Sequence, residues 1–276
     1  MKSIFLACLF ALTAGSSFAD GWKLVWSDEF DKPGPPDPAK WNYETGFIRN
    51  REAQYYTTRP ENARVENGML VIEARKEQFK NPDYDPAAKS SDWKHRREFA
   101  AYTSASLLTK YHASWTYGRI EVRAKLPAGR GVWPAIWMLG TNEDSVGWPD
   151  CGEIDLMEMV GFQPDMIYGH IHTEESVQTK KKTDGAGIKI AGASDAFHVY
   201  AIEWDASHID FYVDNQKYYT YHNPGKGAAS WPFDSGQYLI LNLAIGGDWG
   251  GRKGIDDAIF PQRFYIDYVR VYQKQP

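Results

Sequence analysis

The chain has 276 residues and a formal net charge of −5, from 36 acidic and 31 basic side chains. This balance argues against nucleic acid and anionic membrane surfaces as partners. Aromatic residues are abundant, with 11 Trp, 17 Tyr and 13 Phe, which favours either a β-rich core or a surface for the flat apolar faces of sugars.

The first residues have the build of a secretory signal peptide: Lys2, then an apolar run, then small residues that end at Ala19. The apolar run is too short to span a bilayer, and Cys8 lies inside it, whereas a lipoprotein needs a cysteine directly after it. We therefore predict a signal peptide over residues 1–19 and a secreted or periplasmic protein. Cleavage would leave 257 residues with a net charge of −6, because Lys2 is lost. Cys151 then has no partner for an internal disulfide, so a large core must hold the fold.

The rest of the chain alternates strand patterns with turn signals. Residues 119–126 alternate apolar and charged side chains, as in a half-buried antiparallel strand, and residues 238–247 form an apolar run typical of a buried strand. Similar strand patterns occur at 69–75, 198–204, 208–214 and 264–272. Turn signals between strands occur at Asn67-Gly68, Pro127-Ala128-Gly129 and Asp214-Asn215. No long segment has a helical period, and no linker or repeat divides the chain. We predict one all-β domain over 20–276, a two-sheet antiparallel sandwich of the jelly-roll type.

The stretch DCGEIDLMEMVG, residues 150–161, places Glu153, Asp155 and Glu158 in an apolar strand pattern. On a regular strand Glu153 and Asp155 share one face and Glu158 lies on the other. A β-bulge at Leu156–Met157 would add one residue and bring Glu158 to the shared face. Ordinary solvated charge fits poorly beside the tryptophans upstream, and the spacing lacks the pattern of a calcium loop. Converging carboxylates predict glycoside hydrolysis by one nucleophile and one acid/base.

The acid motif resembles the E-x-D-x-x-E motif of glycoside hydrolase family 16, in the bulged form found in laminarinases. Other segments occur in the family's order over essentially the whole of residues 20–276. They are WSDEF (26–30), NREAQYYT (50–57), ENGMLVIEA (66–74), YGRIEVRAKLPAGRGVWPAIWMLG (117–140), GWPDCGEIDLME (147–158), HIHT (170–173), LNLAIGGDW (241–249) and YIDYVRVYQ (265–273).

The resemblance implies a jelly roll with a concave substrate groove and an endo-acting, retaining β-1,3-glucanase that cuts laminarin-like glucans. By this resemblance Glu153 is the nucleophile, Glu158 is the acid/base and Asp155 supports the nucleophile. Independently, three carboxyls this close cannot all ionise without cost, so at least one pKa should be raised. We expect no cofactor for catalysis, a β-glucan as partner, and a monomer. The alternatives are a mixed-linkage β-1,3-1,4-glucanase and a non-catalytic β-glucan-binding protein on the same scaffold.

Further residues are assigned by the same resemblance. The candidates for substrate binding are Asn50, Glu52, Trp133, Trp137, Trp148, His172, Asn242 and Trp249, with core packing as the competing interpretation for Trp137. Arg51 replaces the second Asn common in the family, and Ser106 stands where many relatives have Arg. A structural Ca²⁺ on the convex side would be bound by Glu29, the main chain of Gly68, and Asp267; alternatively, Asp267 merely faces solvent. A His170–His172 metal pair lacks a third ligand.

Overall fold

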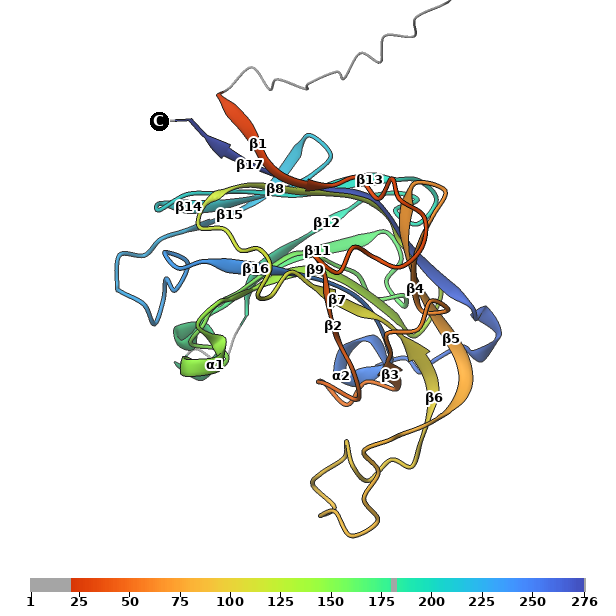
Figure 1. The fold of residues 1–276 in the computed structure, drawn as a ribbon. Helices are drawn as coiled ribbons and strands as arrows, with labels where there is room; N and C mark the ends of the chain where they lie inside the picture. The colour runs from red at the N-terminus through yellow and green to blue at the C-terminus, as the bar shows by residue number, and fades with distance from the viewer. Residues whose placement is uncertain (1–20, 180–182, 276) are drawn as a thin grey trace, which may run out of the picture.

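The computed structural model describes residues 21–179 and 183–275, so the predicted signal peptide lies outside the described residues. Strands are the main regular elements of the fold, and they form two sheets that lie one over the other (Figure 1). The strands are Trp22–Asp28 (β1), Asn42–Glu44 (β2), Gln54–Tyr56 (β3), Ala63–Glu66 (β4), Met69–Lys80 (β5), Phe99–Ser104 (β6), Ser106–Leu108 (β7), Gly118–Lys125 (β8), Val132–Gly140 (β9), Glu153–Glu158 (β10), Met166–His172 (β11), Asp184–Lys189 (β12), His198–Trp204 (β13), His208–Val213 (β14), Gln216–His222 (β15), Gln237–Ile245 (β16) and Gln262–Lys274 (β17).

Helical segments in the described residues are short turns between strands. They are Glu143–Val146 (α1), Glu175–Thr179 (η1), Gly247–Gly250 (α2) and Asp257–Ile259 (η2). None of the helices in the described part of the chain is long and apolar enough to cross a membrane. The predicted all-β architecture, without long helices, is confirmed.

The two sheets have different strand orders. The larger sheet runs β15-β14-β13-β8-β17-β5-β6-β3, with β1 paired to β17 and β4 paired to β5. The smaller, seven-stranded sheet runs β12-β11-β10-β9-β16-β7-β2. Strand pairing is antiparallel apart from the parallel pair β3–β6. Because β16 inserts between β9 and β7, residues more than 100 positions apart become neighbours in the smaller sheet.

The predicted strands form where the patterns placed them, with ends displaced by a few residues. The alternating segment 119–126 becomes β8, whose Ile120, Val122 and Ala124 are fully buried. The apolar run 238–247 becomes β16, which is buried along its whole length. The turns Asn67-Gly68 and Asp214-Asn215 place Asn67 and Asp214 at φ of 54° and 55°, in the left-handed region that Asn and Asp tolerate.

The core lies between the two sheets, since side chains from both contribute to one buried cluster. Ile120 on β8 and Val269 on β17 meet Ile154 on β10 and Leu241 on β16 in this cluster. A second, separate buried cluster contains Trp137 and Leu139 of β9. It lies on the face of the smaller sheet that points away from the core, which we call the outer face.

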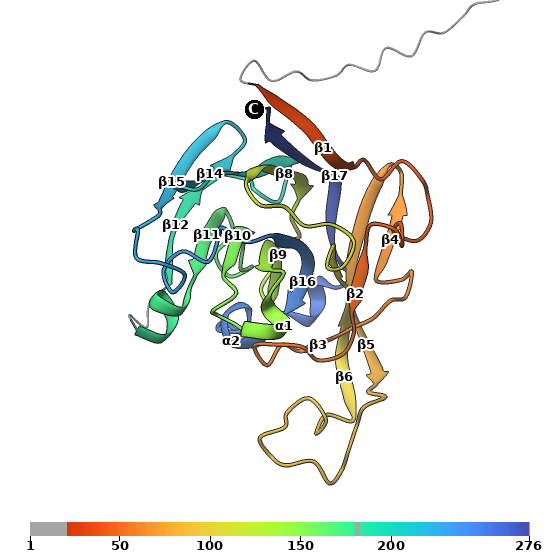
Figure 2. The ribbon, with the colours of Figure 1, turned by 60° about the vertical axis from the view of Figure 1, so that its left-hand side comes forward.

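Two features border the outer face. The turns α1 and α2 lie on this side of the smaller sheet, and both views show them near the ends of its strands (Figure 2). The long hairpin β5–β6 extends past the body of the molecule and ends in the loop 81–98 (Figure 1). The outer face of β10 and its neighbours is therefore framed by segments from distant parts of the chain.

Candidate active site

A β-bulge in β10 brings the three acids of the motif to one face. On the β9 side, Asp155 pairs with Trp137 and Met157 pairs with Ile136, so Leu156 is one residue extra. On the β11 side, the register shifts by one residue between Asp155 and Glu158. Ile154, Leu156 and Met157 enter the core between the sheets, and the acids take the outer face. The predicted bulge at Leu156–Met157 is confirmed.

Glu158 is held by two nitrogen atoms from neighbouring strands. Trp133 Nε1 on β9 donates to Glu158 Oε1 at 3.0 Å, and His170 Nδ1 on β11 lies 2.7 Å from Glu158 Oε2. Glu158 is only 8% exposed. The ring of Trp249, after β16, packs against both of these residues: its centroid lies 5.5 Å from that of Trp133 and 5.7 Å from that of His170. These contacts fix the direction in which the carboxyl of Glu158 points.

Glu153, Asp155 and Glu158 form a row on the outer face, which we call the acid row. Glu153 occupies its more open end. The indole N–H of Trp148, a residue that is 51% exposed, donates a short hydrogen bond to Glu153 Oε2. His172 Nε2 lies 3.1 Å from Asp155 Oδ2 and 3.9 Å from Glu153 Oε1. Asp155 is thus enclosed between the two glutamates, under the His172 ring, and only 2% of it is exposed.

The electrostatic environment of the acid row acts on the pKa of Asp155. Burial raises the pKa of the Asp155 carboxyl well above its ordinary value, and the negative charges of Glu153 and Glu158 raise it further. The protonated form can donate a hydrogen bond to Glu153, and this bond also favours the proton on Asp155. Two carboxyls on either side of a protonated third can act as nucleophile and proton donor, which is the pairing that glycoside hydrolysis requires.

Asp155→Asn should stabilise the protein at neutral pH while it slows turnover. An Asp whose pKa is higher in the folded than in the unfolded state stabilises the fold below its unfolded pKa of about 3.9. This contribution is lost as pH rises through the folded value. The amide never ionises, so the Tm of the variant should exceed that of the wild type increasingly from about pH 4 to pH 8, by about 2–4 °C for each ~1 kcal/mol recovered.

The exposed Asp31 provides the matched control. Asp31→Asn removes a carboxylate of the same size from the surface, so its Tm should follow the wild type across the same pH range. Calorimetry of the three proteins between pH 4 and pH 8 makes the comparison. A Tm difference between Asp155→Asn and wild type that shrinks as pH rises would contradict the raised pKa.

The other predicted substrate-binding residues lie at different depths. Trp137 is 6% exposed and its indole N–H donates to Asn242 Oδ1 at 2.7 Å, so both side chains are buried beneath the outer face. Burial raises the pKa of Glu52, which accepts hydrogen bonds from Gln54 Nε2 at 2.7 Å and Asn50 Nδ2 at 3.3 Å. Of this group Asn50 is the exposed member. Their roles in binding stay predictions.

The chain is similar in sequence and in fold to known glycoside hydrolases. The model of the family "Glycosyl hydrolases family 16" matches residues 50–270. The chain belongs to this family. A β-glucanase from Rhodothermus marinus is 45% identical, over 99% of this chain and 93% of its own length. The solved laminarinase of the same organism has a TM-score of 0.82 and 46% identity, covering 94% of this chain and 100% of that chain.

A second solved structure of family 16 is that of a non-specific endo-β-1,3(4)-glucanase, co-crystallised with 1,3-β-D-cellotriosyl-glucose. It has a TM-score of 0.82 and 45% identity, covering 92% of this chain and 95% of that chain. The residues that the family model matches, 50–270, include the acid motif in β10. The fold of this chain is therefore the family 16 jelly roll.

As a glycoside hydrolase of family 16, the chain needs no cofactor for catalysis. Two sets of atoms on the outer face lie within 4.8 Å of one another, as metal ligands would: Glu153, Asp155 and His172, and Asp155, Glu158 and His170. Both sets belong to the acid row. In each, an indole N–H already binds the glutamate, which suits a carboxylate that works as acid, base or nucleophile.

Both carboxylates among the three predicted calcium ligands, Glu29 and Asp267, bind arginines. Both carboxyl oxygens of Glu29 accept from Arg270, at 3.0 and 2.8 Å, and Asp267 accepts from Arg123 at 2.6 Å. The Arg270 side chain lowers the pKa of Glu29. A cation at this place would have to displace Arg270 from Glu29, and binding of Ca²⁺ by Glu29, Gly68 and Asp267 stays a prediction.

Sequence reasoning missed two residues that the structure brings to this face. His170 was considered only as half of a metal pair, although its two-residue spacing from His172 on a strand already puts both rings on one face. Arg49 was not considered. Its guanidinium lies 4.8 Å from the centre of the Trp137 ring and pairs with Glu44, which in turn accepts from Ser106 Oγ at 2.6 Å. No local pattern points to Arg49, because its contact with Trp137 on β9 joins residues 88 positions apart.

Proposed function

We propose that the protein is an endo-acting, retaining β-glucanase that hydrolyses β-1,3-glucosidic bonds in laminarin-like glucans. The observation that carries the proposal is the bulged row of acids on the outer face, with a separate N–H donor on each glutamate. Two such carboxyls, one on each side of the glycosidic bond to be cleaved, match the requirements of a retaining double displacement.

In this mechanism Glu153 attacks the anomeric carbon while Glu158, in its protonated form, gives its proton to the departing glycosidic oxygen. The result is a covalent glycosyl-enzyme. Glu158 then takes a proton from water, which attacks the same carbon and releases Glu153. Trp133 and His170 keep Glu158 aimed at the glycosidic oxygen, and protonated Asp155 shares its proton with Glu153.

The non-catalytic alternative explains these contacts less well. A binding protein needs aromatic surfaces and hydrogen-bonding groups, but it does not need three carboxyls gathered where burial and the neighbouring negative charges raise the pKa of Asp155. Three acids in one row destabilise the folded state at neutral pH, and such a cost is typical of a site that does chemistry.

The preferred linkage is the finer part of the proposal. The laminarinase of R. marinus supports β-1,3-glucan as the substrate. The non-specific endo-β-1,3(4)-glucanase, at 45% identity, supports mixed-linkage β-1,3-1,4-glucan as the second candidate. We further propose that the protein is exported, on the signal-peptide pattern of residues 1–19, and that it works as a monomer on its polysaccharide.

The purified protein should cut laminarin to short oligosaccharides, attack barley mixed-linkage glucan to a smaller extent and leave cellulose almost untouched. Sizing the released products over time tests this, because an endo-acting enzyme releases a ladder of lengths before any single sugar accumulates. Rapid hydrolysis of agarose with no activity on laminarin would contradict the proposal.

A further inference from the structure

Two consecutive residues between β2 and β3 have a left-handed backbone, which is strained at Arg51. Asn50 and Arg51 have φ values of 53° and 50°, in the left-handed region that side chains other than Asn, Asp and Gly rarely adopt. A backbone of this kind persists only where surrounding contacts determine it, and it often marks a functional element. The strained turn, residues 49–52, also closes on itself, since Glu52 N donates to Arg49 O at 3.1 Å.

Arg97 binds this turn from the loop 81–98 at the end of the β5–β6 hairpin. Its guanidinium donates to the main-chain oxygen of Glu52 at 2.6 Å and to that of Arg51 at 3.4 Å. The same group lies between two aromatic rings, 4.9 Å from the centres of both Phe47 and Trp93. Burial lowers the pKa of Arg97. A planar guanidinium suits this place because it can donate to two carbonyls and stack on rings at once.

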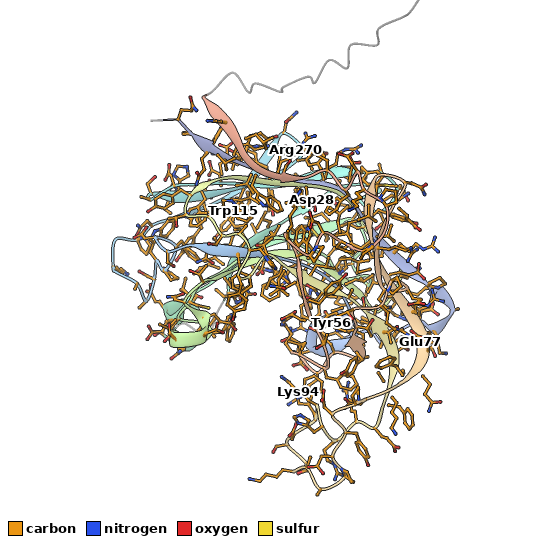
Figure 3. All side chains as sticks on the ribbon, viewed as in Figure 1. Asp28, Tyr56, Glu77, Lys94, Trp115 and Arg270 are labelled. Atoms are coloured by element: carbon orange, nitrogen blue, oxygen red, sulfur yellow. The ribbon has the colours of Figure 1, made fainter. Side chains whose placement is uncertain are left out.

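The other side of the turn is held by the segment that follows β16. Asp248 N donates to Asn50 O at 2.9 Å, and Ala53 N donates to Ile245 O at 2.7 Å. Gly247 allows this approach, because a Cβ there would lie 2.9 Å from Asn50 O. The turn is therefore fixed between a segment next to the acid row and the hairpin loop, which Lys94 marks in Figure 3 below Tyr56.

The strained turn carries side chains that reach the outer face. Arg49 covers the ring of Trp137, and Glu52 accepts from Tyr56 OH at 3.3 Å. Tyr56 OH in turn accepts from Asn242 Nδ2 at 2.9 Å. Trp137 pairs in register with Asp155, so the contacts that start at Arg97 end beside the acids.

We infer that Arg97 is a positioning residue for substrate binding: it holds the strained turn 49–52 and thereby places Arg49 and Asn50 at the sugar-binding surface beside Trp137. This inference rests on the proposed function, since it takes the outer face as the place where the glucan lies. Arg97 itself touches no reacting group. Its loss should therefore weaken the binding of sugar units remote from the cleaved bond and leave the chemical step nearly intact.

Arg97→Ala tests the inference, with Arg96→Ala as the matched control. Arg96 is the exposed neighbour in the same loop, and its side chain donates to Pro86 O at 3.2 Å, away from the turn 49–52. For Arg97→Ala we expect the KM for laminarin to rise about tenfold, the effect of losing one well-placed charged hydrogen bond, with kcat within about threefold of wild type. Arg96→Ala should match the wild type in both.

Direct binding separates positioning from a merely structural role. In the Glu158→Gln background, titration calorimetry with laminarihexaose should show a Kd about tenfold weaker when Arg97→Ala is added, and an unchanged Kd when Arg96→Ala is added. The lysine of Arg97→Lys can reach one carbonyl and cannot stack in the same way, so this variant should give an intermediate Kd. If Arg97→Ala does not fold, the Kd of Arg97→Lys tests the inference.

A lower Tm with unchanged Kd and KM in both Arg97 variants would overturn the inference and leave Arg97 a structural residue. A wild-type protein that does not cut laminarin would instead overturn the proposed function, so the two failures are distinguishable.

Discussion

Glu153→Ala should abolish laminarin hydrolysis, by about 10,000-fold or more in kcat, yet give an α-glycosyl azide when azide and an activated β-glycosyl fluoride are added. Removal of the nucleophile leaves a space beneath the anomeric carbon, and azide can enter it from that side. The fluoride leaves without a proton, so the reaction bypasses the need for an acid. Product configuration by NMR is the measurement.

Glu158→Ala should behave in the opposite way. The glycosyl-enzyme on Glu153 still forms from a substrate with a good leaving group, and azide, which needs no general base, attacks it to give the β-azide with net retention. Loss of the acid/base should lower kcat on laminarin by about 100- to 10,000-fold. Asp155→Asn is the control within the same row: it should turn over slowly and give neither azide product. An exchange of the two anomers between the glutamate variants would reverse the assigned roles.

Deletion of Met157 should lower the stability of the protein strongly while it keeps the three acids on one face. The bulge places two residues, Leu156 and Met157, in the core opposite one residue of β9. Without Met157 the sequence reads E-x-D-x-E, and a regular strand then points all three acids the same way. The core loses one fully buried side chain, which should cost about 2–5 kcal/mol. Activity on laminarin should persist within about tenfold, a smaller loss than that of one positioned catalytic group.

Met157→Ala is the matched control for the deletion, since it empties the same part of the core without any change of register. Denaturant unfolding of both variants, with laminarin assays under native conditions, separates packing from strand phase. A folded deletion variant that loses activity as completely as Glu153→Ala would show that the neighbouring strands retain the bulged register and turn Glu158 away from the outer face.

Much of the fold could be predicted because a β-strand has a pattern that can be recognised in the local sequence. Side chains alternate with a period of two, so residues 119–126 and 198–204 could be read as strands without knowledge of their partners. The acid row could be predicted for the same reason. Its only irregularity is one extra residue, and the three acids show where that residue must be if they are to work together. The motif order across residues 26–273 then pointed to the family.

The tertiary structure alone decided which strands are neighbours and what surrounds each functional side chain. Pairing of β16 with both β7 and β9 joins segments more than 100 residues apart, and no local pattern specifies it. For this reason the sequence did not show that Arg49 would cover Trp137, or that Arg97 would bind the turn 49–52. It also did not show that the predicted calcium carboxylates would face Arg270 and Arg123. Alternation determines which face of a strand a side chain occupies. Its contacts on that face depend on which strands pair and in which register, and this is fixed only in the folded chain.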